Sequence, residues 1–209
     1  MEDLLRFNFN QNYLILDTET EGLNLVSTRP WQVSWITAKG KSITSKNDRY
    51  LLWNDLKMSD GAARITGFNF FDYKSKAEDP KIVLNDLWKI ILDPTYIIIG
   101  QNILGFDVYV LNILRKCCGL NSDYSYISRV LDTRALAMAI ATNNKEISKS
   151  DVLMQYKFVN HRDKKIKTSQ SALLKHYQID HDPSMLHNAL YDIEMTFKIF
   201  QKQIQEIYI

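Results

Sequence analysis

Residues 13–20 read YLILDTET, an apolar run that leads directly into Asp17 and Glu19. Side chains along a β-strand alternate between its two faces, so these two carboxylates point the same way. Like charges held side by side repel each other and do not both ionise unless a cation lies between them. Oxygen ligands favour Mg²⁺ or Mn²⁺ over zinc. The stretch predicts a strand that ends in a metal site, although a strand entering a polar turn gives the same pattern.

A second strand-like run also ends near an acid. Residues 96–107 read YIIIGQNILGFD, which predicts a buried strand, a short loop and a helix that begins at Asp107. In α/β sheets, binding sites assemble at the ends of strands. We therefore expect Asp107 to join Asp17 and Glu19.

The third pattern opens a long helix close to residue 209. Apolar residues at 186, 190, 193, 197, 200, 204 and 207 form a stripe for the core, with His187 and Asp192 beside its beginning. Five residues of a regular helix turn the side-chain direction by roughly 140°, so we expect His187 on the loop or first turn and Asp192 one turn in. A His with a pKa of about 6.5 can take a proton from water. The other histidines, His161, His176 and His181, are expected to be solvated or satisfied in the core.

Taken in order, the three patterns resemble those of the DEDDh exonucleases, which include exonuclease I, oligoribonuclease and the proofreading subunits of bacterial replicative polymerases. The resemblance runs from about residue 13 to residue 200. Its motifs are Asp-x-Glu-Thr with Gly-Leu at 17–23, Phe-Asp at 106–107, and His followed after four residues by Asp at 187–192. A minor family feature, Ile-x-Gly, appears at 65–67. The resemblance implies an RNase H-like α/β fold, with a central mixed β-sheet flanked by α-helices.

The resemblance also implies a role for each matched residue. Asp17, Glu19 and Asp192 would hold one divalent ion, and Asp17, with Asp107 acting through water, would hold a second. Two Mg²⁺ or Mn²⁺ ions about 3.5 to 4 Å apart activate the attacking water and steady the leaving oxygen, and His187 would be the general base. Thr20 would touch the terminal 3′ hydroxyl, and apolar neighbours would enclose or wedge the last bases. The residues expected to contact nucleic acid are Thr20, Leu23, Ile65, Thr66, Asn102 and Phe106.

Two positions depart from the family's usual sequence. Glu21 stands where Thr is frequent, and this added carboxylate would either disturb metal affinity or face solvent. The spacing from Asn102 to Asp107 is one residue longer than in the proofreading subunits and resembles that of B-family polymerase proofreading domains. Those domains carry a Tyr where this chain has Asn188, so the histidine subtype is the better match.

Length and composition agree with one domain. A chain of 209 residues with 45% hydrophobic residues can bury a sizeable core, and we expect residues 1–209 to form a single exonuclease domain. We expect no signal peptide, and the sequence holds no apolar run near the roughly 18 residues that span a bilayer. The adjacent Cys117 and Cys118 do not suggest a disulfide framework. We expect a soluble cytoplasmic protein in which both cysteines are buried.

Local patterns predict the remaining elements. We expect β-strands at 31–38 and 49–53, forming an antiparallel meander, and further strands from 96 and at 129–131. Asp79 and Pro80 predict a helix start that leads to about residue 92. Further helices are expected at 106–118, 133–142, 169–177 and 186–208. The segment 143–168 is interpreted as a hairpin or a mobile loop at the mouth of the site.

The charge pattern leaves one question open. A net charge of +2 argues against a strong general clamp on nucleic acid. Between residues 161 and 175, however, five basic residues stand against one acid, namely Arg162, Lys164, Lys165, Lys167 and Lys175 against Asp163. This stretch either follows a phosphate backbone or forms an ordinary solvated surface. Most of the four tryptophans, Trp31, Trp35, Trp53 and Trp88, are expected in the core rather than stacked on bases.

These observations predict a 3′-to-5′ exonuclease that releases nucleoside 5′-monophosphates from single-stranded 3′ ends. DNA is the expected substrate, since the chain lacks additional RNA-binding elements. An exoribonuclease that trims short RNA is one alternative, because the catalytic residues do not distinguish the two sugars. A non-catalytic module that binds nucleic acid or a polymerase is another, but none of the expected catalytic residues is missing. A polymerase or another replication protein is a candidate partner.

Overall fold

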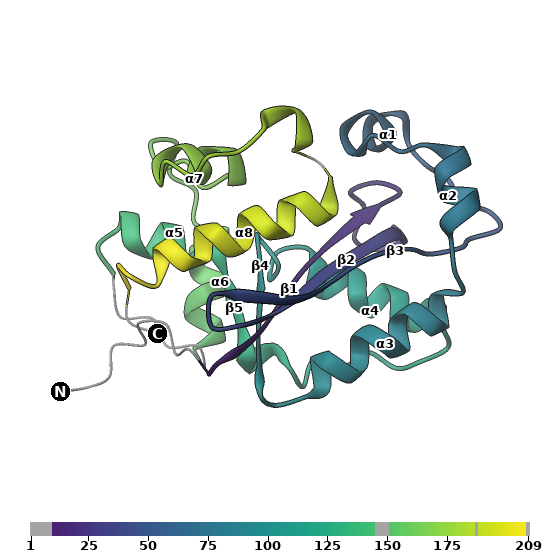
Figure 1. Cartoon of the computed structure of the whole chain (residues 1–209), viewed down its shortest axis with the longest axis horizontal. Coiled ribbons are helices and arrows are strands. Elements are labelled where there is room, and N and C mark those ends of the chain that lie inside the picture. Colours follow the sequence, from purple (N-terminus) through teal and green to yellow (C-terminus); the bar gives the residue numbers. More distant parts are fainter. Residues whose placement is uncertain (1–9, 145–150, 187, 208–209) are drawn as a thin grey trace.

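A computed structural model describes residues 10–144, 151–186 and 188–207. At its centre lies a five-stranded sheet in the order β3-β2-β1-β4-β5 (Figure 1). Its strands are β1 (Asn12–Thr20), β2 (Pro30–Lys39), β3 (Ser42–Tyr50), β4 (Tyr96–Gly100) and β5 (Val130–Asp132). The pairs β1·β2 and β2·β3 are antiparallel, whereas β1·β4 and β4·β5 are parallel. The expected mixed sheet is therefore confirmed, and the carboxyl ends of β1, β4 and β5 meet at one edge.

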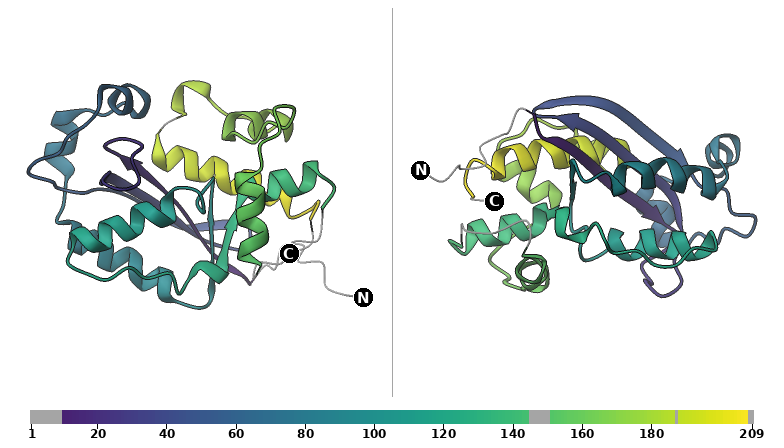
Figure 2. Two further views of the ribbon diagram at one scale, coloured as in Figure 1. Left: turned by 180° about the vertical axis from the view of Figure 1, so that it is seen from behind. Right: turned by 90° about the horizontal axis from the view of Figure 1, so that it is seen from below.

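Alternate side chains of β1 enter two hydrophobic cores, one on each face of the sheet. Leu14 and Leu16 face one side and pack with α3 (Pro80–Leu92) and α4 (Asp107–Cys117). Tyr13 and Ile15 face the other side, where α5 (Thr133–Ala141) and α8 (Ala189–Gln203) cover the sheet. Figure 2 shows these helix pairs on opposite faces of the sheet. Trp31, Trp35 and Trp88 are buried and Trp53 is partly buried, as expected.

The helix starts follow their capping residues. Asp79 accepts a hydrogen bond from Lys81 N at 2.8 Å, which confirms the predicted start of α3. Asn188 accepts one from Tyr191 N at 3.0 Å, so α8 begins at Ala189 rather than at 186. A shorter helix, α7 (Gln170–His176), packs on α8. Within the described residues, no helix is both long and apolar enough to cross a membrane.

Several sequence expectations are wrong in detail. The third strand is the polar and largely exposed β3, not 49–53, because pairing with β2 rather than hydrophobicity forms it. Residues 151–168 contain a helix, α6 (Val152–Asn160), instead of a hairpin or loop, since Gln155 and Val159 are buried against α5 and β5; residues 145–150 lie outside the described ranges. Of the two cysteines, Cys118 is buried but Cys117 is exposed.

Two short helices were missed altogether. They are α1 (Asp60–Thr66) and α2 (Phe70–Lys76), each only seven residues long. Ser59 and Asn69 cap their first turns, and Gly67 ends α1 in a left-handed conformation with φ of 64°. Helices of this length show no repeating apolar stripe, so hydrophobic periodicity does not reveal them.

Candidate active site

The expected acids lie together at the carboxyl end of β1. Asp17 and Glu19 share one face of the strand, and Asp107 begins α4 directly beside it. Thr18 joins the two elements, because its backbone N–H and its Oγ1 both donate to Asp107 Oδ1, at 3.0 and 2.7 Å. Asp192 lies in the first turn of α8, close enough to act electrostatically on Asp17 and Glu19. The structure therefore brings four carboxylates from three elements to one place.

Burial, and then charge repulsion, raise the pKa values of the carboxyl groups in this cluster. Burial, followed by the charges of Asp107, Glu19 and Asp192, raises the pKa of Asp17 well above its usual value. Burial, together with the charges of Asp192 and Asp107, raises the pKa of Glu19 to about 8. Burial also raises the pKa of Asp107 to about 7, although the bonds from Thr18 act in the opposite direction. A cation among these groups would remove the conflict, and their oxygen donors suit Mg²⁺ or Mn²⁺.

The carboxylates are close but do not converge on one point. Within residues 10–144, 151–186 and 188–207, no three His, Cys, Asp or Glu side chains are already arranged to hold a metal ion. Asp107 Oδ1 already accepts both hydrogen bonds from Thr18. The oxygen donors and the raised pKa values fit divalent cations. The side chains do not form a complete set of metal ligands in this arrangement. His187, the expected general base, lies outside the described residues, immediately before the cap residue of α8.

The pKa values lead to a prediction for the protein kept in a chelator. A carboxyl group whose pKa is higher in the folded than in the unfolded state stabilises the fold when it is protonated. For Glu19 this contribution to stability is complete below about pH 4.5, and it is lost as the pH rises through about 8. Thermal unfolding temperatures should therefore fall more steeply between about pH 5 and pH 8 in the wild type than in Glu19→Gln. Added Mg²⁺ or Mn²⁺ should restore stability at the upper end, and identical pH profiles for the two proteins would contradict the assignment.

A pocket of about 400 Å³ opens beside Glu19, between the end of β1, α1 and the start of α4. Its walls include five of the six residues expected to contact nucleic acid, namely Thr20, Leu23, Ile65, Thr66 and Phe106. Leu23 is 86% exposed and Ile65 is 55% exposed, so both side chains present apolar surface at this pocket. Thr20 Oγ1 donates to Gly22 O at 2.6 Å and so shapes the turn after β1.

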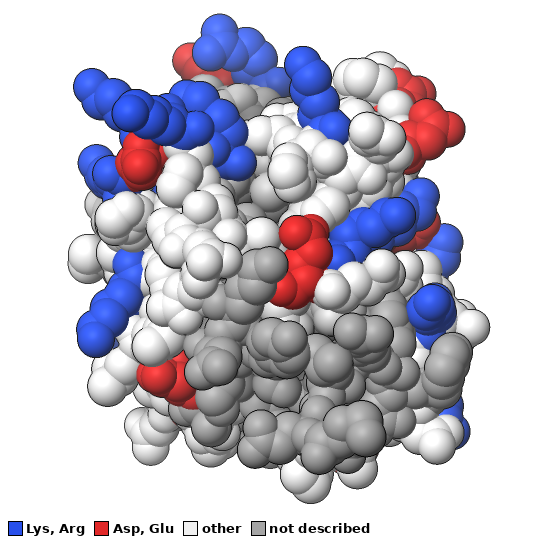
Figure 3. All heavy atoms as spheres, turned by 90° about the vertical axis from the view of Figure 1, so that its left-hand side faces the viewer, with Lys and Arg blue, Asp and Glu red and all other residues white. Residues whose placement is uncertain are grey.

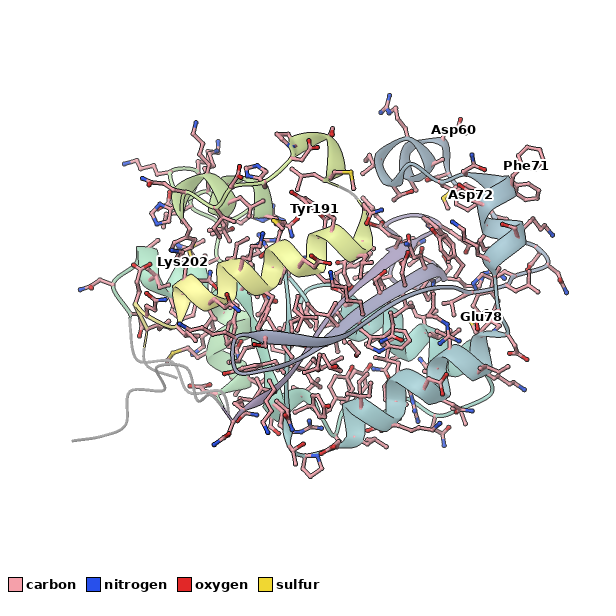
Figure 4. The ribbon with its side chains drawn as sticks, in the orientation of Figure 1. Asp60, Phe71, Asp72, Glu78, Tyr191 and Lys202 are labelled. Carbon is pink, nitrogen blue, oxygen red and sulfur yellow. The ribbon has the colours of Figure 1, made fainter. Side chains whose placement is uncertain are left out.

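A second hollow of about 540 Å³ lies between α1, α2 and the start of α8. Ile65 and Thr66 line both hollows, so the end of α1 separates them. Asn188, the neighbour of His187, lines this second one. Figure 4 shows Tyr191 on the side of α8 that faces α7, where its hydroxyl accepts a hydrogen bond from Asp182 N at 2.7 Å. This bond ties the first turn of α8 to the chain that precedes it.

Two predicted features lie elsewhere. Asn102 does not line the apolar pocket; its Oδ1 accepts a hydrogen bond from Arg134 Nη1 at 3.1 Å, and its φ is 61°. Glu21 neither enters the acid cluster nor faces solvent. It accepts hydrogen bonds from the Arg29 side chain and from Lys57 N, which lower its pKa although burial acts to raise it. Glu21 therefore joins the turn after β1 to residues 55–57.

Asp132 is a site residue that the sequence interpretation missed. It is fully buried at the end of β5 and accepts hydrogen bonds from four backbone N–H groups, those of Asn102, Leu104, Arg134 and Ala135. Burial raises its pKa to about 6 against these four donors. Asp132 thereby fixes the loop that carries Asp107. An acid between an apolar run and a helix start is a helix-cap signal, and it was available in the sequence.

The sequence profile of the RNase T exonuclease family matches residues 14–200, a range that contains all of these groups. The chain belongs to this exonuclease family. The match confirms a DEDD-type exonuclease of the RNase H-like superfamily, as the three motifs indicated. A search among functionally curated proteins gave no match.

Solved structures of E. coli exonuclease I share the fold of this family member. A complex with a dA16 oligonucleotide aligns with a TM-score of 0.74 and 18% identity, covering 94% of this chain and 41% of that one. A complex with a dT13 oligonucleotide aligns with a TM-score of 0.72 and 19% identity, covering 94% of this chain and 42% of that one. A zinc-bound complex with single-stranded DNA aligns with a TM-score of 0.72 and 19% identity, covering 92% of this chain and 40% of that one. The chain thus spans less than half the length of these structures, and the similarity establishes the RNase H-like fold.

Proposed function

We propose that the protein is a metal-dependent 3′-to-5′ exonuclease that hydrolyses single-stranded nucleic acid, preferably DNA, to nucleoside 5′-monophosphates. One observation supports this most: a cluster of carboxylates with raised pKa values adjoins an apolar pocket in a chain of the exonuclease family. This combination suits a metal-dependent exonuclease, which places cations at the phosphate and binds the terminal nucleoside beside them.

Each residue of the site has a separate role in this proposal. Asp17, Glu19 and Asp192 would hold one ion, and Asp17 with Asp107 would hold the other. Bound Mg²⁺ or Mn²⁺ would supply the Lewis acid that activates water and stabilises the leaving 3′ oxygen. Thr18 and Asp132 keep Asp107 and its loop in place while charge develops. His187, at the entrance to α8, would accept the proton of the attacking water.

The pocket suits a terminal base of any identity. Leu23, Ile65 and Phe106 offer apolar and aromatic surface, which stacks on bases without reading their edges. Ile65 stands between the two hollows, in a position to separate the last base from the one before it. Thr20, which lines the pocket at the end of β1, would contact the 3′ hydroxyl.

DNA is favoured because the similar exonuclease I structures were solved with dA16 and dT13 oligonucleotides. The test is digestion of 5′-labelled DNA and RNA single strands of one sequence, each with a free or a blocked 3′ end, in Mg²⁺ or Mn²⁺. We expect stepwise shortening of the free DNA strand and protection of the blocked one. Faster shortening of RNA would reverse the substrate preference. Binding of both strands without shortening would instead identify a non-catalytic module.

A further inference from the structure

The basic residues between 161 and 175 lie beside the candidate active site. For these residues we use the name basic surface, meaning Arg162, Lys164, Lys165, Lys167 and Lys175, all of which are exposed. Four of them stand on the loop 161–168 between α6 and α7, and Lys175 stands on α7. Figure 3 shows Lys and Arg side chains gathered along the upper edge of the face that carries α7.

The structure attaches this loop to the catalytic elements at both ends. Before the loop, α6 packs against Gly105, where an added Cβ would lie 3.1 Å from Val159 Cγ1. At its end, Gln101 Nε2 donates to Thr168 O at 2.8 Å. Gly105 and Gln101 both belong to the loop that leads to Asp107. Gln170 Nε2, just beyond, donates to Asp192 O at 2.6 Å. The loop is therefore positioned by the same backbone that positions two of the catalytic acids.

The charges of this surface are not neutralised within the protein. Across the described residues, none of its five cationic side chains forms an ion pair with a carboxylate. The single acid of the stretch, Asp163, accepts a hydrogen bond from Lys165 N at 2.8 Å and so stabilises a local turn. Clustered, exposed and unpaired cations have the charge that attracts a nucleic-acid backbone.

The location of the surface suggests which part of the strand it meets. Figures 1 and 2 show α1 and α7 on opposite sides of the beginning of α8. If the terminal base occupies the pocket beside α1, the strand crosses the acid cluster and leaves toward α7. We propose that the basic surface binds the phosphates of the single strand on the 5′ side of the cleaved bond. This inference rests on the proposed function and adds the path of the substrate outside the active site.

The test compares two proteins with the same change in net charge. One carries Arg162→Gln, Lys164→Gln, Lys165→Gln and Lys167→Gln. The control carries Lys39→Gln, Lys81→Gln, Lys89→Gln and Lys116→Gln, which remove exposed cations at the far end of β2 and on α3 and α4. Binding of a fluorescent single strand of about 20 nucleotides is measured in chelator at several salt concentrations. Each lost phosphate contact should reduce the slope of log affinity against log salt by about 0.7.

We expect the first variant to bind the long strand at least about tenfold more weakly with a flatter salt dependence, and the control to resemble the wild type. Hydrolysis of a dinucleotide should be unchanged in both, because a dinucleotide is too short to reach the loop. An unchanged salt slope in the first variant, or an equal loss in the control, would overturn the proposed path. Failure of the wild type to hydrolyse any strand would instead refute the proposed function, which the binding measurement does not test.

Discussion

Replacing Asp17 with Ala is expected to lower the turnover number by about 10³-fold or more while the protein remains folded. A bound cation contributes several kcal/mol to stabilising the transition state, and about 1.4 kcal/mol corresponds to a tenfold rate change. Glu19→Ala, Asp107→Ala and Asp192→Ala should have effects of similar size, since each removes a proposed ligand. Hydrolysis of a 3′-labelled strand at saturating Mg²⁺ measures the effect.

Stability separates loss of a ligand from loss of the fold. In chelator, Asp17→Ala should unfold at the same temperature as the wild type or higher, because it relieves repulsion within the cluster. Asp60→Asn, on the exposed first turn of α1, removes a negative charge outside the cluster and should leave turnover unchanged. Activity near the wild-type level in any of the four Ala variants would remove that residue from the site.

His187→Ala is expected to slow hydrolysis by roughly 10² to 10⁴-fold, the usual contribution of a general base. Mg²⁺ or Mn²⁺ binding should change far less than the rate. The rate of the wild type should rise with pH through the neutral range as His187 loses its proton, and this ascending limb should be absent from the variant. Measuring rate and metal affinity on the same preparations separates the two effects.

The matched control is His176→Ala, which removes an exposed imidazole at the end of α7. Its rate and pH profile should equal those of the wild type. A loss of metal affinity as large as the loss of rate in His187→Ala would make His187 a ligand instead of a base. Full activity in that variant would require another group to accept the proton.

The parts of the fold that the sequence predicted are those in which a local pattern and tertiary packing agree. In β1, four apolar residues precede the acids, and alternate side chains do enter two different cores. Asp79 followed by Pro80 predicted α3 to the residue. The same reasoning predicted that Asp17, Glu19 and Asp107 lie at one edge of the sheet, because parallel strands end at the same edge.

Features that depend on partners distant in the chain were not predictable in this way. β3 is mostly polar and exists because β2 pairs with it. α6 is held by Gln155, whose side chain exchanges hydrogen bonds with the backbone of β5, and no periodic pattern indicates such a contact. The four donors to Asp132 come from two separate segments, so its role in holding the loop before Asp107 emerges only from the structure.

The most direct test of a metal-dependent 3′ exonuclease is chromatographic identification of the product released from a single-stranded DNA as Mg²⁺ is titrated. The structure and the family lead us to expect nucleoside 5′-monophosphates that appear only with added Mg²⁺ or Mn²⁺, at a rate that saturates with the ion. A preparation of Asp17→Ala treated identically should release almost none. Equal release in excess chelator, or products longer than mononucleotides from within the strand, would contradict the account.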